Sequence, residues 1–160
     1  MQLSLYTDYG IRALVYLACF EDEQRPIPAR EIADAFGIPK NHLHKIVLKL
    51  VKHGFLVSLP GRSGGLKLAQ RPQKIMIGEV VTLLEPGLAP VNCMDKALNT
   101  CPITPFCALR DLMQDAMKKF VDTLNHKSLD QLLLNRATLK AVLSQGGQLP
   151  APRRGQRGHH

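Results

Sequence analysis

The chain has 160 residues, of which 45% are hydrophobic, and its formal net charge is +8. This length predicts one core of ordinary size with an appendage, and no apolar run approaches the length of a membrane span. The first residues also lack a basic segment followed by an apolar one, so we expect a cytoplasmic protein whose four cysteines are reduced unless they hold a metal.

The first predicted element is a helix that begins with Thr7 as its cap and ends near the acidic residues 21–23. Four apolar residues recur in it at helical spacing: Ile11, Leu14, Val15 and Ala18. A short second helix is expected over 29–36 and is closed by Gly37.

A third helix is predicted between Pro39 and Gly54. Its apolar positions follow the i, i+3, i+4, i+7, i+8 rule at Leu43, Ile46, Val47, Leu50 and Val51. The second and third helices, joined by a turn that contains a glycine, form a helix-turn-helix. Two strands are then expected over 55–59 and 66–69, and the Gly-rich turn between them makes this hairpin a wing.

Positive charge is concentrated on this unit, since residues 35–78 contain no Asp or Glu and eight basic side chains: Lys40, Lys45, Lys49, Lys52, Arg62, Lys67, Arg71 and Lys74. A polyanion such as DNA is the partner that this charge favours, although a solvated basic face is the alternative. The expected DNA contacts are four residues in the first half of the third helix and two in the wing turn: Lys40, Asn41, His42, Lys45, Arg62 and Ser63.

The second half of the chain is also predicted to be mainly helical. A short helix is expected over 77–84 and a long one over about 105–125, whose wide apolar stripe is Leu109, Leu112, Met113, Ala116, Met117, Phe120, Val121 and Leu124. The stripe suits a dimer interface, and packing within its own subunit is the alternative. Ser128 is expected to cap a last helix to about Asn135, with a further helical turn through Leu143.

The predicted fold is therefore mainly α, a winged helix-turn-helix with a small β-hairpin wing and a long C-terminal dimerisation helix. We expect a DNA-binding domain over 1–75, a cysteine loop with dimerisation helices over 76–145, and a disordered basic tail over 146–160, where Arg153, Arg154 and Arg157 lie.

Three cysteines follow the pattern Cys93-x7-Cys101-x5-Cys107 in a loop that prolines interrupt. Zinc sites prefer closely spaced Cys-x2-4-Cys pairs and thiol-disulfide enzymes use Cys-x-x-Cys, and this loop has neither. Three thiolates suit an iron–sulfur cluster and leave one ligand position for an oxygen or nitrogen side chain, or for a small molecule. Cys19, inside the first helix, is expected to be a buried thiol.

Several motifs together carry a resemblance that covers residues 1–140. They are Thr7-Asp8-Tyr9-Gly10, Asn41-His42-Leu43, Gly61-Arg62-Ser63-Gly64-Gly65 and Cys101-Pro102-Ile103-Thr104-Pro105-Phe106-Cys107. With these motifs the chain resembles the nitric-oxide-sensing NsrR repressors, within the winged-helix regulator family that also contains IscR. The resemblance implies a DNA-binding homodimer that acts as a repressor, whose cluster senses nitric oxide and controls operator binding.

The resemblance also implies a ligand set. Each subunit would hold a cluster through Cys93, Cys101 and Cys107, with Asp8 of the other subunit as the fourth ligand in the [4Fe-4S] members. IscR-like members place a histidine three residues after the last cysteine, and Arg110 stands there in this chain. By itself Asp8 is also an ordinary first-turn acid with Arg12 one helical turn away.

Two alternatives stay open from the sequence. One is a regulator of the same fold that reports iron or cluster supply through a [2Fe-2S] centre. The other is an enzyme with a thiolate nucleophile, but no His–Cys pair with an orienting acid can be assigned and no Gly-rich cofactor loop follows a strand. We therefore expect no enzymatic activity.

Overall fold

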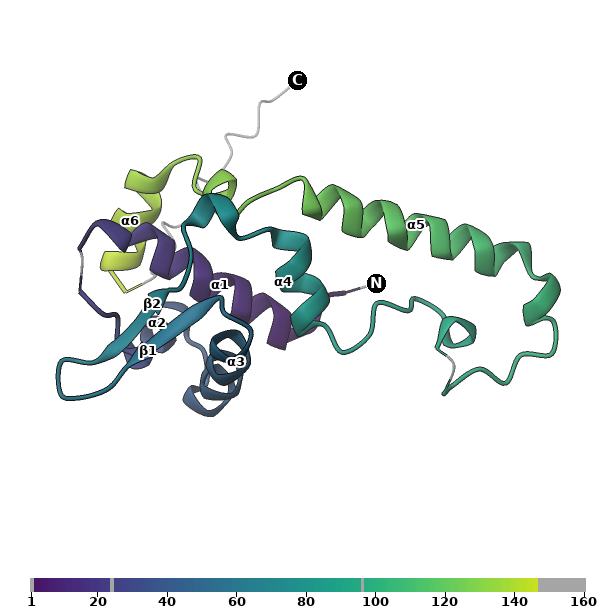
Figure 1. Cartoon of the computed structure of the whole chain (residues 1–160), viewed down its shortest axis with the longest axis horizontal. Coiled ribbons are helices and arrows are strands. Elements are labelled where there is room, and N and C mark those ends of the chain that lie inside the picture. The colour runs from purple at the N-terminus through teal and green to yellow at the C-terminus, as the bar shows by residue number, and fades with distance from the viewer. Residues whose placement is uncertain (1, 24, 96, 147–160) are drawn as a thin grey trace, which may run out of the picture.

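The structure is a computed structural model that describes residues 2–23, 25–95 and 97–146 (Figure 1). Its helices are α1 (Leu5–Cys19), α2 (Ala29–Phe36), α3 (Lys40–Lys52), α4 (Ile77–Leu84), α5 (Ala108–Asn125) and α6 (Arg136–Ser144). Its strands are β1 (Leu56–Leu59) and β2 (Gly65–Leu68), which pair antiparallel. Short 3-10 turns lie at Glu21–Glu23, Pro72–Lys74, Asn92–Met94, Thr104–Phe106 and Asp130–Leu132. The predicted mainly α winged-helix fold is confirmed.

Helix α1 begins earlier than predicted, because Ser4 and not Thr7 is its cap. The Ser4 hydroxyl accepts a hydrogen bond from the Thr7 amide at 3.3 Å, which satisfies a free donor of the first turn. Thr7 is fully buried within the helix and its hydroxyl donates to Glu85 at 2.7 Å. Thr7 therefore serves as a buried hydrogen-bond donor to Glu85, which lies 78 positions away in the chain, and not as the helix cap.

The helix-turn-helix and the wing form as the sequence predicts. Gly37 closes α2 with φ 64°, a left-handed conformation that glycine adopts without steric cost. Strand β1 begins one residue later than predicted and β2 begins and ends one residue earlier. Their register pairs Leu56 with Leu68 and Leu59 with Gly65. Ile27 adds a bridge to Leu66, and its backbone lies so close to Gly65 that a side chain at Gly65 would overlap it.

The core lies where α1 crosses α3 and α4. Its largest fully buried side chains include Leu14, Ile32, Leu43, Ile46, Leu50, Leu56, Val80 and Leu84. Gly10 of α1 permits a close approach of Leu84, because a Cβ atom at that position would overlap Leu84 Cδ1. The apolar face of α3 is thus buried against α1, and its polar face is left to solvent.

Helix α4 has the bounds predicted for it, whereas α5 begins at Ala108 because Pro105 lies in a preceding 3-10 turn. Figure 1 shows that the chain after α4 runs outward from the winged-helix body and that α5 leads back toward the body from the far end. The first turns of α5 are therefore far from the core around α1.

The helix predicted from Ser128 to about Asn135 was wrong, whereas the further helical turn expected through Leu143 is present as α6. Ser128 does not cap a helix but pairs with Met76 in a β-bridge, and the Leu129 amide donates to the Ile75 carbonyl at 2.8 Å. Within 128–135 only a short 3-10 turn forms, at Asp130–Leu132, and the α-helix follows over Arg136–Ser144. The Arg136 Nε donates to the Cys19 carbonyl at 3.2 Å, which fixes α6 against the end of α1.

Residues 147–160, with the three tail arginines, lie outside the described residues, so the predicted disorder of the tail stays a prediction. Among the helices of the described ranges, none combines the length and the apolar character that a membrane crossing requires.

Candidate DNA-binding surface and cysteine loop

The first half of α3 presents the four side chains expected to contact DNA. Lys40, Asn41, His42 and Lys45 are all exposed. Four apolar residues are buried on the opposite side, Leu43, Ile46, Val47 and Leu50, whereas Leu48 is exposed. The helix therefore separates a polar outer face from a packed inner face, as a recognition helix requires.

A groove runs between α2 and the start of α3, and its lining includes two basic side chains, Arg30 and Lys40, with Asn41 and His44. Arg30 lies five residues before the acid-free segment that marked the basic block in the sequence, and so it was missed. Asp34 lies 3.4 Å from Arg30 Nε, but both side chains are largely exposed, so this ion pair is weak.

The wing brings Arg62 and Ser63, both exposed, to the tip of the hairpin. Gly61 has φ 104°, and the Gly64 amide donates to the Gly61 carbonyl at 3.0 Å, which closes the turn. In Figure 1 the hairpin and α3 lie on the same side of α1. The wing arginine and the recognition helix are thus offered to one surface, as binding of one duplex demands.

Tyr6, on the first turn of α1, supports α3 from behind, and sequence reasoning missed it. Its hydroxyl donates to the Lys45 carbonyl at 3.1 Å, and the Lys49 ammonium lies 5.8 Å from its ring centroid. Burial raises the pKa of the Tyr6 phenol, which keeps the hydroxyl a donor. Only the folded chain reveals a contact between residues 39 positions apart.

The cysteine loop connects α4 to α5, and its three thiols are free. Cys93 lies in the 3-10 turn Asn92–Met94, Cys101 is exposed, and Cys107 is the residue directly before α5. The side chain of Asn99 organises the second half of the loop, since its Oδ1 accepts bonds from the Cys101 amide at 3.1 Å and the Thr104 hydroxyl at 3.0 Å.

Within the described ranges, no group of three His, Cys, Asp or Glu residues lies close enough together to hold a single metal ion. The three cysteines share one loop, but the structure does not bring them to one point. Their wide spacing is more compatible with a multinuclear cluster, whose irons lie apart, than with a mononuclear zinc site.

Two observations around the loop fit an anionic iron–sulfur cluster. Cys107 is the N-cap residue of α5, so it lies at the positive end of the helix dipole. Arg110, one turn further on, carries the one buried side-chain nitrogen or oxygen that has no hydrogen-bond partner in the described part of the chain, its Nε. Thiolate and sulfide sulfurs are acceptors that this donor lacks.

The contacts recorded for Asp8 and Cys19 are with residues outside the cysteine loop. Asp8 forms an ion pair with Arg12 of its own helix at 2.8 Å, which is the ordinary role that its position suggests. Cys19 is completely buried, as predicted, and burial raises the pKa of its thiol. A buried thiol of this kind is a poor nucleophile and a poor ligand.

The apolar stripe of α5 is divided between two environments. In its second half Met117 is buried and Leu124 packs against the core, so packing within the subunit accounts for these two residues. In the first half Leu109 is 54% exposed and Leu112 is 63% exposed, and Phe106 just before the helix is 92% exposed. Exposed apolar side chains in such a row mark an interaction surface.

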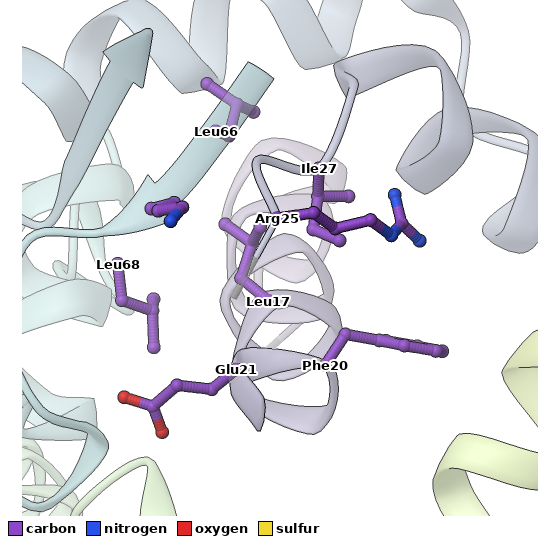
Figure 2. Close-up of a pocket in the computed structure, with 8 residues that line it drawn as sticks. Leu17, Phe20, Glu21, Arg25, Ile27, Leu66 and Leu68 are labelled. Atoms are coloured by element: carbon purple, nitrogen blue, oxygen red, sulfur yellow. The ribbon is translucent and has the colours of Figure 1, made fainter. Parts of the chain in front are cut away.

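A separate pocket lies between the end of α1 and strand β2 (Figure 2). Its walls are Leu17, Phe20, Glu21, Arg25, Ile27, Leu66, Lys67 and Leu68. Figure 2 shows the carboxylate of Glu21 and the guanidinium of Arg25 pointing to different sides of it. The described residues that line it include no Cys or His, so the pocket offers no support to a thiolate enzyme.

Comparison with known proteins adds sequence and fold relatives. The model of the Rrf2 family, described as iron-dependent transcriptional regulators, matches residues 3–135. The HTH-type transcriptional regulator NsrR of Geobacillus kaustophilus is 39% identical over 145 residues, which cover 91% of this chain and 98% of that protein. The regulator of the same name from Bacillus subtilis is 34% identical over 146 residues, with 89% and 97% covered.

Two solved structures show the same fold. A structure described as T. potens IscR superposes with a TM-score of 0.67 at 24% identity and covers 83% of this chain and 86% of its own. The global cysteine regulator CymR of B. subtilis superposes with a TM-score of 0.61, also at 24% identity, over 82% of this chain and 95% of its own.

Proposed function

The chain belongs to the Rrf2 family of iron-dependent transcriptional regulators, and we propose that it is an NsrR-type repressor that binds DNA as a homodimer and releases it in response to nitric oxide. The observation that carries this proposal is the junction of two features in one chain. A basic recognition surface on α3 and the wing is joined, through α4, to a loop with three free cysteines.

In this proposal residues 1–75 bind DNA through Lys40, Asn41, His42, Lys45, Arg62 and Ser63. The lysines neutralise phosphates, and Asn41 has the donor and acceptor needed to read an adenine edge. Arg62 suits the narrow minor groove of A·T-rich DNA. Two such units bind successive major grooves, about 34 Å apart, only when a dimer sets their spacing.

Residues 76–145 supply the cluster loop and the dimer surface. Cys93, Cys101 and Cys107 are the proposed thiolate ligands of a [4Fe-4S] cluster, and Asp8 of the partner subunit is the proposed fourth ligand. When bound, the cluster supplies iron that reacts with nitric oxide. The chain's own part is to hold three thiolates beside the start of α5 and to connect the loop to α1 through α4.

In this scheme Asp8 has two possible partners, the cluster of the other subunit and Arg12 of its own helix. The exchange between them would link the state of the cluster to the DNA-binding unit. Bound across the dimer, Asp8 would tie α1 of one subunit to the loop of the other. Released, it would return to Arg12 on its own helix, where the ion pair is already formed. Loss of that tie would free α1 and with it the spacing of the two recognition helices.

The [2Fe-2S] alternative has less support, because IscR-like members place a histidine where this chain has Arg110. An experiment on protein purified without oxygen separates the alternatives. Iron and sulfide content with the visible spectrum gives the cluster type, and retention of a labelled duplex before and after nitric oxide gives the response. If nitric oxide leaves both the spectrum and DNA binding unchanged, the proposed function is wrong.

A further inference from the structure

Glu85 occupies the boundary between α4 and the cysteine loop, and its side chain caps a different helix. It is the residue that ends α4, and its amide donates to the Val81 carbonyl at 2.9 Å. Its carboxylate oxygen Oε2 accepts three hydrogen bonds from the start of α1. The donors are the Ser4 amide at 3.0 Å, the Ser4 hydroxyl at 3.1 Å and the Thr7 hydroxyl at 2.7 Å.

We propose that Glu85 is a positioning residue that fixes the first turn of α1 to the start of the cysteine loop and so relays the state of that loop to the recognition helix. This inference rests on the proposed function, because it names how the same cluster loop regulates DNA binding.

The charge and burial of this contact favour a specific role. A carboxylate at a helix N-terminus complements the helix dipole, and bonds to an ionised acceptor are stronger than neutral ones. Thr7 is completely buried, so its hydroxyl needs the Glu85 oxygen as an acceptor. If the loop draws Glu85 away, the start of α1 loses three hydrogen bonds at once.

Leu84, the residue directly before Glu85, adds a second contact between α4 and α1. Leu84 packs against Gly10, where a Cβ atom would overlap its Cδ1 and would lie 3.4 Å from Ile46 Cγ2 of α3. Helix α4 therefore touches α1 at two adjacent points, Leu84 on Gly10 and Glu85 on Ser4 and Thr7. Asp8, the proposed ligand of the partner's cluster, lies between these points on the same turns.

From this turn the contact continues to the DNA-binding surface. Tyr6 lies between Ser4 and Thr7 in the chain and donates to the Lys45 carbonyl of α3 at 3.1 Å. Lys45 is one of the proposed phosphate contacts. The series Glu85, Thr7, Tyr6 and Lys45 thus joins the first residue of the loop region to the recognition helix through packed and hydrogen-bonded groups, which is the kind of network that carries coupling.

The test measures the ratio of operator affinities of the cluster-loaded and cluster-free dimer. The duplex is one selected from a random-sequence pool by the loaded wild-type protein. In Glu85→Ala and in Thr7→Val the ratio should fall by at least about fivefold, the lower end of ordinary coupling between sites. Iron, sulfide and the visible spectrum should match the wild type, because neither residue is a proposed ligand.

Two matched variants serve as controls. Thr7→Ser keeps the hydroxyl and should restore the wild-type ratio, and Glu79→Ala removes an exposed glutamate from the same helix and should leave it unchanged. A second readout needs no cluster: in the cluster-free Glu85→Ala dimer, amide hydrogen exchange should rise at residues 4–8.

The outcomes are distinguishable. If the wild type shows a cluster-dependent ratio and both Glu85→Ala and Thr7→Val keep it within about twofold, the relay through Glu85 is wrong and the proposed function stands. If the wild type shows no cluster dependence, the proposed function fails and the relay fails with it. If Glu85→Ala loses its iron, Glu85 belongs to cluster binding, and the positioning role is overturned.

Discussion

Arg12 binds Asp8 through both nitrogens that face it, with Nε 3.1 Å from Oδ1 and Nη2 2.8 Å from Oδ2. The Arg12 guanidinium also lies 5.9 Å from the centroid of the Phe36 ring on α2. In a single subunit the proposed fourth ligand is therefore held by its own helix, and ligation across the dimer would have to break this pair. Both side chains are more than a third exposed, so breaking this ion pair costs little free energy.

Asp8→Ala should therefore retain a cluster, because three thiolates remain, but with an altered visible spectrum and weaker release from DNA. Mixed dimers test the crossing of the ligand. In each mixed dimer one subunit keeps all its cysteines and Cys107→Ala makes its partner cluster-free, so only one cluster is observed. That cluster should show the altered spectrum only when the cluster-free partner also carries Asp8→Ala. A spectrum that follows the substitution within the same chain would leave Asp8 as a first-turn acid only.

Single cysteine substitutions should separate ligands from packing. Cys93→Ala, Cys101→Ala and Cys107→Ala should each lose most of the iron and sulfide found after purification without oxygen. Cys19→Ala is the control: it should keep the cluster and lose about 1 kcal/mol of unfolding free energy, since it removes a buried sulfur. Retention of full iron by Cys101→Ala would refute the ligand set.

The basic surface predicts a steep dependence of DNA affinity on salt, with a loss of several orders of magnitude between about 50 and 200 mM. Arg62→Ala should weaken binding by about 1–3 kcal/mol if the wing makes a base contact. Lys119→Ala, an exposed basic residue of α5, should have little effect. Equal affinities of the two variants would argue against a wing contact, and both can be read from a fluorescence titration.

Local patterns predicted much of the fold because local chemistry determines those elements. The apolar positions of α3 gave its buried face, and Gly37 ended α2 because it alone adopts a positive φ there without cost. The cap of α1 and the helix expected over 128–135 were mispredicted for the opposite reason. Glu85 and Met76 decide them from 78 and 52 positions away.

The candidate site divides in the same way. The cysteines and the exposed residues of α3 carry their chemistry in their residue types and spacing, so the sequence names them. Glu85 and Tyr6 look ordinary in sequence, and only their distant partners give them a role. Arg110 is intermediate: the sequence marks it as a departure from a relative's histidine, and the structure adds that its Nε lacks a partner among the described residues.

The contact of α2 with α1 predicts an acid-sensitive contribution to stability. Arg25 donates two hydrogen bonds to Glu31, at 2.9 and 2.8 Å, and these, followed by the bond from Tyr16, lower the pKa of the Glu31 carboxyl. A lowered pKa means that the contribution is present above the ordinary glutamate value and is lost as the pH falls through the folded value.

Glu31→Gln should therefore lower the thermal midpoint at pH 7, by an amount equivalent to about 1 kcal/mol because the pair is partly screened by solvent. The difference from the wild type should begin to shrink as the pH falls below about 4, the range of an ordinary glutamate. It should vanish only after the pH has passed the lowered folded value, where the wild-type carboxyl is also protonated. Asp34→Asn on the same helix is the matched control, since its ion pair with Arg30 is highly exposed and should contribute little at any pH. A difference that grows on acidification would contradict the assignment.

The exposed half of the α5 stripe predicts where the dimer forms. Leu112 is 63% exposed and Leu109 is 54% exposed in the single chain, so a charge at either position leaves the subunit's own core intact. Leu112→Glu should weaken dimerisation by at least roughly tenfold, equivalent to about 1.4 kcal/mol, because the carboxylate would be buried without a partner in the interface. DNA affinity should fall in parallel, because two recognition helices that are no longer joined bind independently.

Gln114→Glu, an exposed position off the stripe, supplies the control for added charge. Sedimentation velocity at several concentrations gives the dimer constant, and an unchanged constant for Leu112→Glu would place the dimer contact elsewhere.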